Sequence, residues 1–163
     1  MSVMIFITGG TFDKEYDEIR GELYFKDTHM REILELGRSK LDVKIKNLML
    51  IDSLDMQEEE RNVILEHCKS TNINQIVITH GTDTMTTTGK VLADANLEKT
   101  IVLTGAMIPY KFGSSDGLFN LGGALAYAQT LPSGVYVVMN GQYFNYDEVE
   151  KNKNTGVFEK FVK

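Results

Sequence analysis

The sequence predicts a single α/β domain, in which a mainly parallel, doubly wound sheet of the flavodoxin-like kind carries helices on both faces. Short apolar runs rich in β-branched residues recur along the chain, as buried parallel strands do. Segments with apolar residues at helical spacing separate these runs, and this alternation is typical of strand–helix–strand units. A length of 163 residues suits one domain with its own core.

Each element can be expected at a definite place. The apolar runs that predict strands cover residues 3–7, 43–51, 76–78, 100–104 and 134–139. Helical spacing predicts helices over 28–38, from Asp55 to Lys69, around Val91, Leu92 and Ala95, and over 116–129. Asp55 followed by Glu58 resembles an N-cap pattern for the second of these helices.

Two segments stand outside this alternation. Residues 12–26 are polar and mixed, and such a long connection is more often functional than idle. Residues 140–163 are polar and lysine-bearing, and by composition alone they suggest a loosely held tail.

Composition narrows the class of protein. With 17 basic and 23 acidic residues the net charge is −6, which argues against a nucleic-acid partner. The single cysteine, Cys68, lies in an apolar helical pattern and is interpreted as a buried, inert thiol. The first apolar run is too short for a signal peptide, and no run approaches the roughly 20 residues of a membrane span. We therefore expect a cytoplasmic protein with no membrane partner.

Hydroxyl and carboxyl groups follow two of the expected strands. The first strand leads into Thr8-Gly9-Gly10-Thr11, and the strand at 76–78 leads into a turn that holds Thr82 and Asp83. Ligands of open α/β sheets bind just outside the carboxyl ends of the strands, so these groups are expected at one site. Hydroxyls, a carboxylate and exposed turn amides are the groups that acyl transfer requires.

These turns belong to four motifs that together resemble the bacterial-type L-asparaginases. Thr8-Gly9-Gly10-Thr11 resembles their opening signature and His80-Gly81-Thr82-Asp83-Thr84-Met85 their second. Asp52-Ser53-Leu54-Asp55-Met56 resembles the substrate-binding turn between them, and Gly105-Ala106-Met107-Ile108-Pro109 with Ser115-Asp116-Gly117 a later stretch. The resemblance covers nearly the whole chain but only the N-terminal domain of the family, so residues 1–163 are expected to form that catalytic domain without a second one.

The resemblance implies a reaction and assigns catalytic roles. Thr11 would attack the side-chain amide carbon of asparagine, ammonia would leave, and water would release aspartate from the acyl-enzyme. Lys151 would activate Thr82 or a water molecule, with Asp83 orienting the group, and Lys153 is the competing lysine. Tyr24 would assist Thr11, with Tyr16 as the alternative tyrosine.

The same resemblance assigns the substrate contacts, and two positions depart from the family. The substrate-binding positions are Gly10, Ser53, Leu54, Asp83 and Ala106. Leu54 stands where many members carry a polar residue, and Ile108 stands where arginine is usual. No cofactor is implied, and a homodimer or homotetramer is expected.

Parts of the sequence are also compatible with other functions. A module that binds a small amino acid or amide but has lost turnover would keep the same pocket. The glycine turn at Gly9-Gly10 could also cradle a phosphate, although no G-x-G-x-x-G and no Walker lysine accompany it. His29, His67 and His80 show no metal-ligand spacing, and His80 is expected to be a structural member of its turn.

Overall fold

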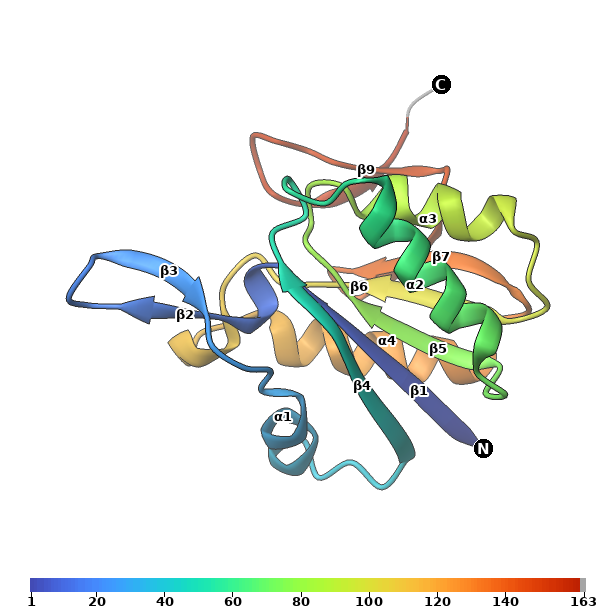
Figure 1. Ribbon diagram of the computed structural model, residues 1–163, viewed down its shortest axis with the longest axis horizontal. Coiled ribbons are helices and arrows are strands. Elements are labelled where there is room, and N and C mark those ends of the chain that lie inside the picture. Colours follow the sequence, from blue (N-terminus) through green and yellow to red (C-terminus); the bar gives the residue numbers. More distant parts are fainter. Residues whose placement is uncertain (162–163) are drawn as a thin grey trace.

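A six-stranded sheet forms the centre of the molecule, as the computed structural model shows for residues 1–161 (Figure 1). Its order is β4-β1-β5-β6-β7-β8, and the pairs are parallel except for β7 with β8. The strands are β1 (Ser2–Gly9), β4 (Asp42–Ile51), β5 (Gln75–Thr79), β6 (Thr100–Thr104), β7 (Gly134–Met139) and β8 (Gln142–Asn145). The five parallel strands have the 2-1-3-4-5 order of flavodoxin-like folds, which confirms the predicted class.

Helices cover both faces of this sheet. On one face lie α2 (Glu58–Ser70) and α3 (Met85–Asp94), and on the other lie α4 (Gly117–Thr130) and the short α1 (Met30–Leu36) (Figure 1). The strand β5 shows why: Ile76 and Ile78 join the apolar cluster beneath α2 and α3, whereas Val77 joins the cluster beneath α1 and α4. Successive strand residues point to opposite faces, so one apolar run supplies two cores.

The helix α2 begins later than the sequence suggested. Its N-cap is Gln57, which forms a capping box with Glu60. Asp55 instead donates its N–H to the Asp52 carbonyl at 3.0 Å, inside a turn that the Asp52 carboxylate also stabilises through the Leu54 N–H. The predicted Asp55 cap was wrong because this Asx turn uses the residues that precede the helix.

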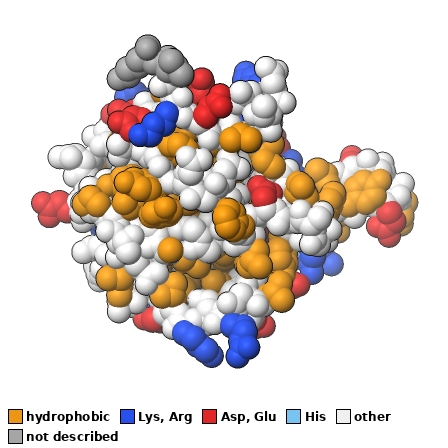
Figure 2. All heavy atoms as spheres, turned by 180° about the vertical axis from the view of Figure 1, so that it is seen from behind, with side chains coloured by type: hydrophobic (Ala, Val, Ile, Leu, Met, Phe, Trp, Pro, Cys, Tyr) orange, Lys and Arg blue, Asp and Glu red, His pale blue; other side chains and the backbone are white. Residues whose placement is uncertain are grey.

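Residues 12–26 form regular structure. A single 3₁₀ turn, η1 (Thr11–Asp13), leads into an antiparallel hairpin of β2 (Lys14–Asp17) and β3 (Glu22–Phe25), which projects from the body (Figure 1). Hydrophobic side chains are visible on this projection (Figure 2), and those of Tyr16, Ile19, Leu23 and Tyr24 are exposed. The connection after Thr11 is therefore a preformed element with an apolar surface.

The segment after β7 is also ordered through residue 161, so the loosely held tail suggested by its composition was wrong for this part, and residues 162–163 lie outside the described chain. After β8, β9 (Val149–Lys151) and β10 (Phe158–Lys160) form a second hairpin. Val149 and Phe158 are buried in the cluster beneath α2 and α3, and the Phe158 N–H donates to Asn140 Oδ1 at 2.9 Å. Two apolar side chains and one amide hold a polar segment against the sheet, and they give Lys151 a fixed place.

Two further expectations from the sequence can be compared with the structure. Cys68 is buried and unpaired, and burial raises the pKa of its thiol to about 12, as expected for an inert thiol. Within residues 1–161, no helix combines the length and the apolar character that crossing a bilayer demands.

Candidate active site

Three turns at the carboxyl ends of β1, β4 and β5 pack directly against one another. Gly10 has a φ of 74°, and a Cβ atom there would lie 2.5 Å from the Gly81 Cα. A Cβ atom on Gly81 would in turn lie 2.4 Å from Ser53 Oγ. Only glycine allows such an approach, so the two glycines bring the turns that carry Thr11, Ser53 and Thr82 together. This meeting point lies where the strand order reverses, the usual ligand position of such sheets.

The structure joins three of the predicted catalytic residues. Lys151 Nζ donates to Thr82 Oγ1 at 3.0 Å and lies 2.5 Å from Asp83 Oδ1. The Thr82 side chain is buried, whereas Asp83 is accessible to solvent. Lys153, the competing lysine, lies in the exposed turn between β9 and β10. The geometry therefore favours Lys151.

A second charged pair borders this group. Lys14, at the start of β2, donates to the Asp52 carboxylate at 2.5 Å. Partial burial alone would raise the pKa of Asp52, but hydrogen bonds from Lys14 and the Leu54 N–H, with the charges of Lys14 and Lys151, lower it below its ordinary value. Asp52 is thus ionised at neutral pH and fastens the base of the hairpin to the Ser53 turn.

The predicted substrate-binding residues differ in exposure. Ser53 is only 1% exposed, and its hydroxyl has no hydrogen-bond partner among the described residues. Leu54 is 68% exposed, while Ala106 is buried. The turn that holds Ala106 adjoins Thr82, because a Cβ atom on Gly105 would lie 3.4 Å from Thr82 Cγ2. A ligand at the surface therefore reaches Ser53 Oγ only after its neighbours shift.

A buried amide, which the sequence analysis missed, holds the far side of the site. Asn120 on α4 donates through Nδ2 to the Gly105 carbonyl at 2.9 Å and to Asp116 at 3.0 Å. Its Oδ1 accepts the Asn140 N–H at 3.1 Å. Asn120 thus ties the ends of β6 and β7 together. An asparagine within the apolar run of α4 was the available signal, since a buried amide needs partners.

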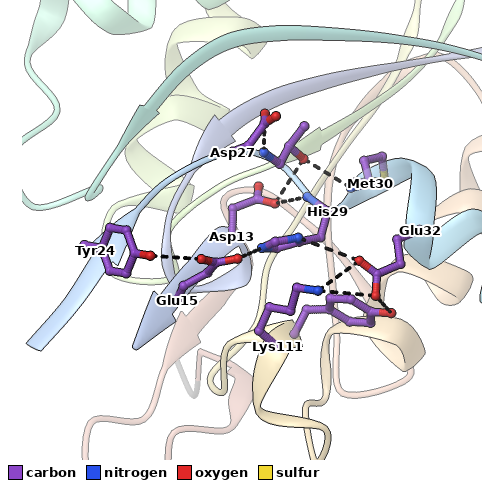
Figure 3. Close-up of polar contacts among 10 residues, drawn as sticks. Asp13, Glu15, Tyr24, Asp27, His29, Met30, Glu32 and Lys111 are labelled. Atoms are coloured by element: carbon purple, nitrogen blue, oxygen red, sulfur yellow. Dashed lines mark hydrogen bonds and ion pairs between the residues drawn. The ribbon is translucent and has the colours of Figure 1, made fainter. Parts of the chain in front are cut away.

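The Tyr24 hydroxyl is engaged within its own hairpin (Figure 3). Its O–H donates to Glu15 Oε2 at 3.1 Å, and this bond raises the pKa of the phenol. The other Glu15 oxygen lies 3.2 Å from His29 Nε2, within ion-pair distance although the geometry is not that of a hydrogen bond. No hydrogen bond joins Tyr24 to Thr11 in the described part of the chain. Tyr16 packs edge-on against Phe112, with 6.4 Å between the ring centroids.

The base of the hairpin is clamped by a buried carboxylate. Asp13 Oδ1 accepts the Thr28 hydroxyl at 3.0 Å and the His29 N–H at 3.1 Å (Figure 3). Burial raises the pKa of Asp13, although these two hydrogen bonds and the nearby His29 oppose the shift. The two ends of the segment that leaves Thr11 and returns at Thr28 are therefore fixed to each other.

His80 takes a structural part in its turn, in line with the prediction. Its Nδ1 lies 2.8 Å from the Gly81 carbonyl and its Nε2 lies 2.7 Å from Thr88 Oγ1. The ring is fully buried, and burial lowers its pKa to about 4, so the imidazole is neutral at pH 7. Within residues 1–161, no cluster of three or more His, Cys, Asp or Glu side chains is arranged to hold a metal ion.

The fold and the turns at its switch point define an α/β protein of the asparaginase type. The family model described as "Asparaginase, N-terminal" matches residues 2–161, and the chain belongs to this family. This confirms the resemblance inferred from the four motifs.

Individual relatives agree with this assignment. A probable periplasmic L-asparaginase of Haemophilus influenzae is 33% identical, over 96% of this chain and 48% of its own. A glutaminase-asparaginase of Acinetobacter glutaminasificans is 41% identical, over 53% of this chain and 27% of its own. The structure of the thermostable L-asparaginase from Thermococcus kodakarensis has a TM-score of 0.88 and 26% identity, over 100% of this chain and 52% of its own. The chain thus spans about half the length of the first of these relatives and of this structure.

The contact between Gly81 and Ser53 generates a first prediction. Gly81→Ala should lower the free energy of unfolding by about 1–3 kcal/mol, because the new methyl group must displace Ser53 or the turn. Gly122→Ala is the matched control: nothing lies within 4 Å of a Cβ atom there, so a helical position gains about 0.5–1 kcal/mol. Urea titration measures both. Equal effects of the two substitutions would contradict the close packing.

The buried imidazole generates a second prediction. His80 titrates near its ordinary value when unfolded but only at about 4 when folded, so the unfolded chain binds the proton first as the pH falls. The contribution of the neutral His80 to the free energy of unfolding is therefore fully present well above pH 6.5. It is lost as the pH falls from 6.5 towards 4, by about 2 kcal/mol at pH 5. Urea titrations at pH 7.5 and pH 5 should show this loss, and a smaller one in His80→Gln. An unchanged loss in the variant would assign it to other groups.

Proposed function

We propose that this chain is an amidohydrolase that releases ammonia from L-asparagine or a close analogue such as L-glutamine. The observation that carries the proposal is the contact of Lys151 Nζ with both Thr82 Oγ1 and Asp83 Oδ1, beside the packed glycines. Family membership supports the same class of reaction, since the relatives are named L-asparaginase and glutaminase-asparaginase.

The nucleophile of the proposed reaction is Thr11. It follows Gly10 in the first turn and is only partly exposed. Its Oγ1 would attack the side-chain amide carbon of the substrate, the C–N bond would break, and the nitrogen would leave as ammonia with the threonine's proton. Water would then cleave the resulting ester, releasing aspartate and restoring the hydroxyl. Backbone N–H groups near Thr82 would hold the oxyanion, at about 3 kcal/mol per donor.

The proposed role of Lys151 is to remove a proton from Thr82 or from a water molecule. This role depends on Asp83. Lys151 Nζ forms an ion pair with Asp83 Oδ1 at 2.5 Å, and an ammonium held in an ion pair has no lone pair with which to accept a proton. In the proposed complex, the α-ammonium of the substrate takes the exposed Asp83 carboxylate as its partner. Lys151 then loses its counterion and can pass its proton on. Binding of an amino acid, rather than of a simple amide, would thus prepare the base.

The α-carboxylate of the substrate has cationic and hydroxyl partners nearby. Lys14 and Lys151 are both close enough to influence Asp52, and a carboxylate at this edge of the sheet would experience the same positive charges. The Ser53 hydroxyl, which is buried without a partner, would be satisfied by a carboxylate oxygen once the site rearranges. These groups favour a small α-amino acid.

A second candidate is a module that binds this amino acid without turning it over. The observations that favour it are the hydrogen bond that keeps Tyr24 on Glu15 and the closed position of Ser53. The exposed Leu54 also favours the binding module, because many members of the family carry a polar residue at this position. The two candidates differ in one measurement, since only the enzyme releases ammonia from a bound amide.

Three further proposals accompany the enzymatic one. Residues 1–163 act as an N-terminal-type catalytic domain without a cofactor, the chain assembles as a homodimer or homotetramer, and it works in the cytoplasm. The name of the Haemophilus influenzae relative places that protein in the periplasm, so the compartment of this chain stays a prediction.

The choice between the lysines yields a third prediction. Lys151→Met should lower kcat for ammonia release from L-asparagine by about 10²–10⁴-fold, the usual contribution of a general base. Lys153→Met makes the same change in an exposed turn and should retain the wild-type rate. Thr11→Ala should abolish turnover while L-aspartate still raises the Tm. If the wild type binds L-aspartate but releases no ammonia, the binding module replaces the enzyme.

The hairpin yields a fourth prediction. Tyr24→Phe should lower kcat about 100-fold because the proposed transfer of the proton away from the Thr11 hydroxyl loses the phenol that assists it. Tyr16→Phe removes the equivalent hydroxyl from the same hairpin and should change kcat less than twofold. A larger loss for Tyr16→Phe in the same ammonia assay would reverse the assignment of the loop tyrosine.

A further inference from the structure

An arginine outside the predicted site lies at the centre of a buried polar network. Arg61 is in the first turns of α2 and is only 8% exposed. Arginine is rarely this buried unless a carboxylate pairs with it. Within residues 1–161 Arg61 takes part in no ion pair. Its charge is therefore satisfied by neutral groups alone.

Those neutral groups belong to two separate elements. Arg61 Nη1 donates to the Met56 carbonyl at 2.8 Å, at the end of the Ser53 turn. Its Nη2 donates to Thr84 Oγ1 at 3.0 Å and its Nε to Thr88 Oγ1 at 3.2 Å, both at the start of α3. The planar fork of one guanidinium thus spans the gap between the turn after β4 and the helix after β5.

Each threonine passes the connection on to the candidate site. Thr84 donates its hydroxyl to the Ser53 carbonyl at 2.8 Å. Thr88 donates to His80 Nε2 at 2.7 Å, because the Nδ1 of the neutral ring must carry the proton that it gives to the Gly81 carbonyl. One branch therefore ends at Ser53 and the other at the residue before Thr82.

We propose that Arg61 is a positioning residue that sets the distance between the Ser53 turn and the Thr82–Asp83 turn. Two of its hydrogen bonds lead to the Ser53 turn, one through the Met56 carbonyl and one through the Thr84 hydroxyl. The third leads to the turn before Thr82, through the Thr88 hydroxyl and His80. The inference rests on the proposed function, in which Ser53 holds the α-carboxylate while Thr82 and Asp83 serve the chemistry. Lysine could not replace it, since a single ammonium on a flexible stem lacks the fixed fork that reaches three acceptors on two elements.

The first test measures how firmly the two turns are held, without using activity. Hydrogen exchange should accelerate in Arg61→Ala at residues 52–56 and 80–84 together. Arg31→Ala is the matched control, because Arg31 is exposed on α1 and the net charge changes equally. Unchanged exchange in both turns would overturn the proposal. This result is independent of whether the wild type hydrolyses an amide, so a wild type without ammonia release would refute the proposed function alone.

The second test measures how far the rate of catalysis depends on this spacing. Arg61→Ala and Arg61→Lys should each lower kcat/KM for L-asparagine by about 10- to 100-fold, the usual effect of displacing reacting groups by about 1 Å. Guanidinium chloride at millimolar concentration should restore part of the activity of Arg61→Ala, whereas urea, its neutral isostere, should not. Full activity in Arg61→Lys would show that charge alone suffices and would overturn the positioning role.

Thr84 offers an independent variant if Arg61→Ala does not fold. Thr84→Val keeps the shape but removes the hydroxyl that links Arg61 to Ser53, so KM should rise more than kcat falls. Thr84→Ser keeps the hydroxyl and should restore the wild-type KM. Equal KM values for the valine and serine variants would contradict the link between Arg61 and the Ser53 turn.

Discussion

Close packing of backbone against backbone at Gly10, Gly81 and Ser53 is the constraint on which the rest of the site depends. Parallel strands bring their carboxyl ends to one edge of the sheet, but side chains normally keep the following turns apart. Here the glycines remove that separation, since a methyl group on either would lie 2.5 Å or less from its neighbour. The turns that carry hydroxyl groups from three different strand ends therefore lie against one another.

Much of the fold was predictable because a strand or helix with a clear apolar pattern can be recognised from its own residues. The strands β6 and β7 have the predicted bounds, and Ile76–Ile78 shows why a buried parallel strand reads as a continuous run. The hairpin β2–β3 and the segment after β7 were not predictable in the same way. Their polar residues carry no clear period, and Val149 and Phe158 are too few to form a recognisable pattern although their burial fixes the segment.

The candidate site was predictable only where a motif carried it. Lys151 lies 69 residues after Thr82 and 68 after Asp83, and only the resemblance to a family suggested that it meets them. Asn120 and Arg61 lie outside every motif, and their importance comes from partners that a single sequence does not reveal. Arg61 in particular looks like a solvated charge, because it follows the acidic residues of the first helical turn and arginine is usually exposed.

The ordered hairpin after Thr11 has a thermodynamic consequence. Its four residue pairs are already formed, and its base is fixed through Asp13 and through the contact of Lys14 with Asp52. Ordering a free segment around a substrate would cost about 1–2 kcal/mol per residue in backbone entropy. The preformed hairpin has already met that loss during folding, so a ligand that docks against it would not have to supply the energy.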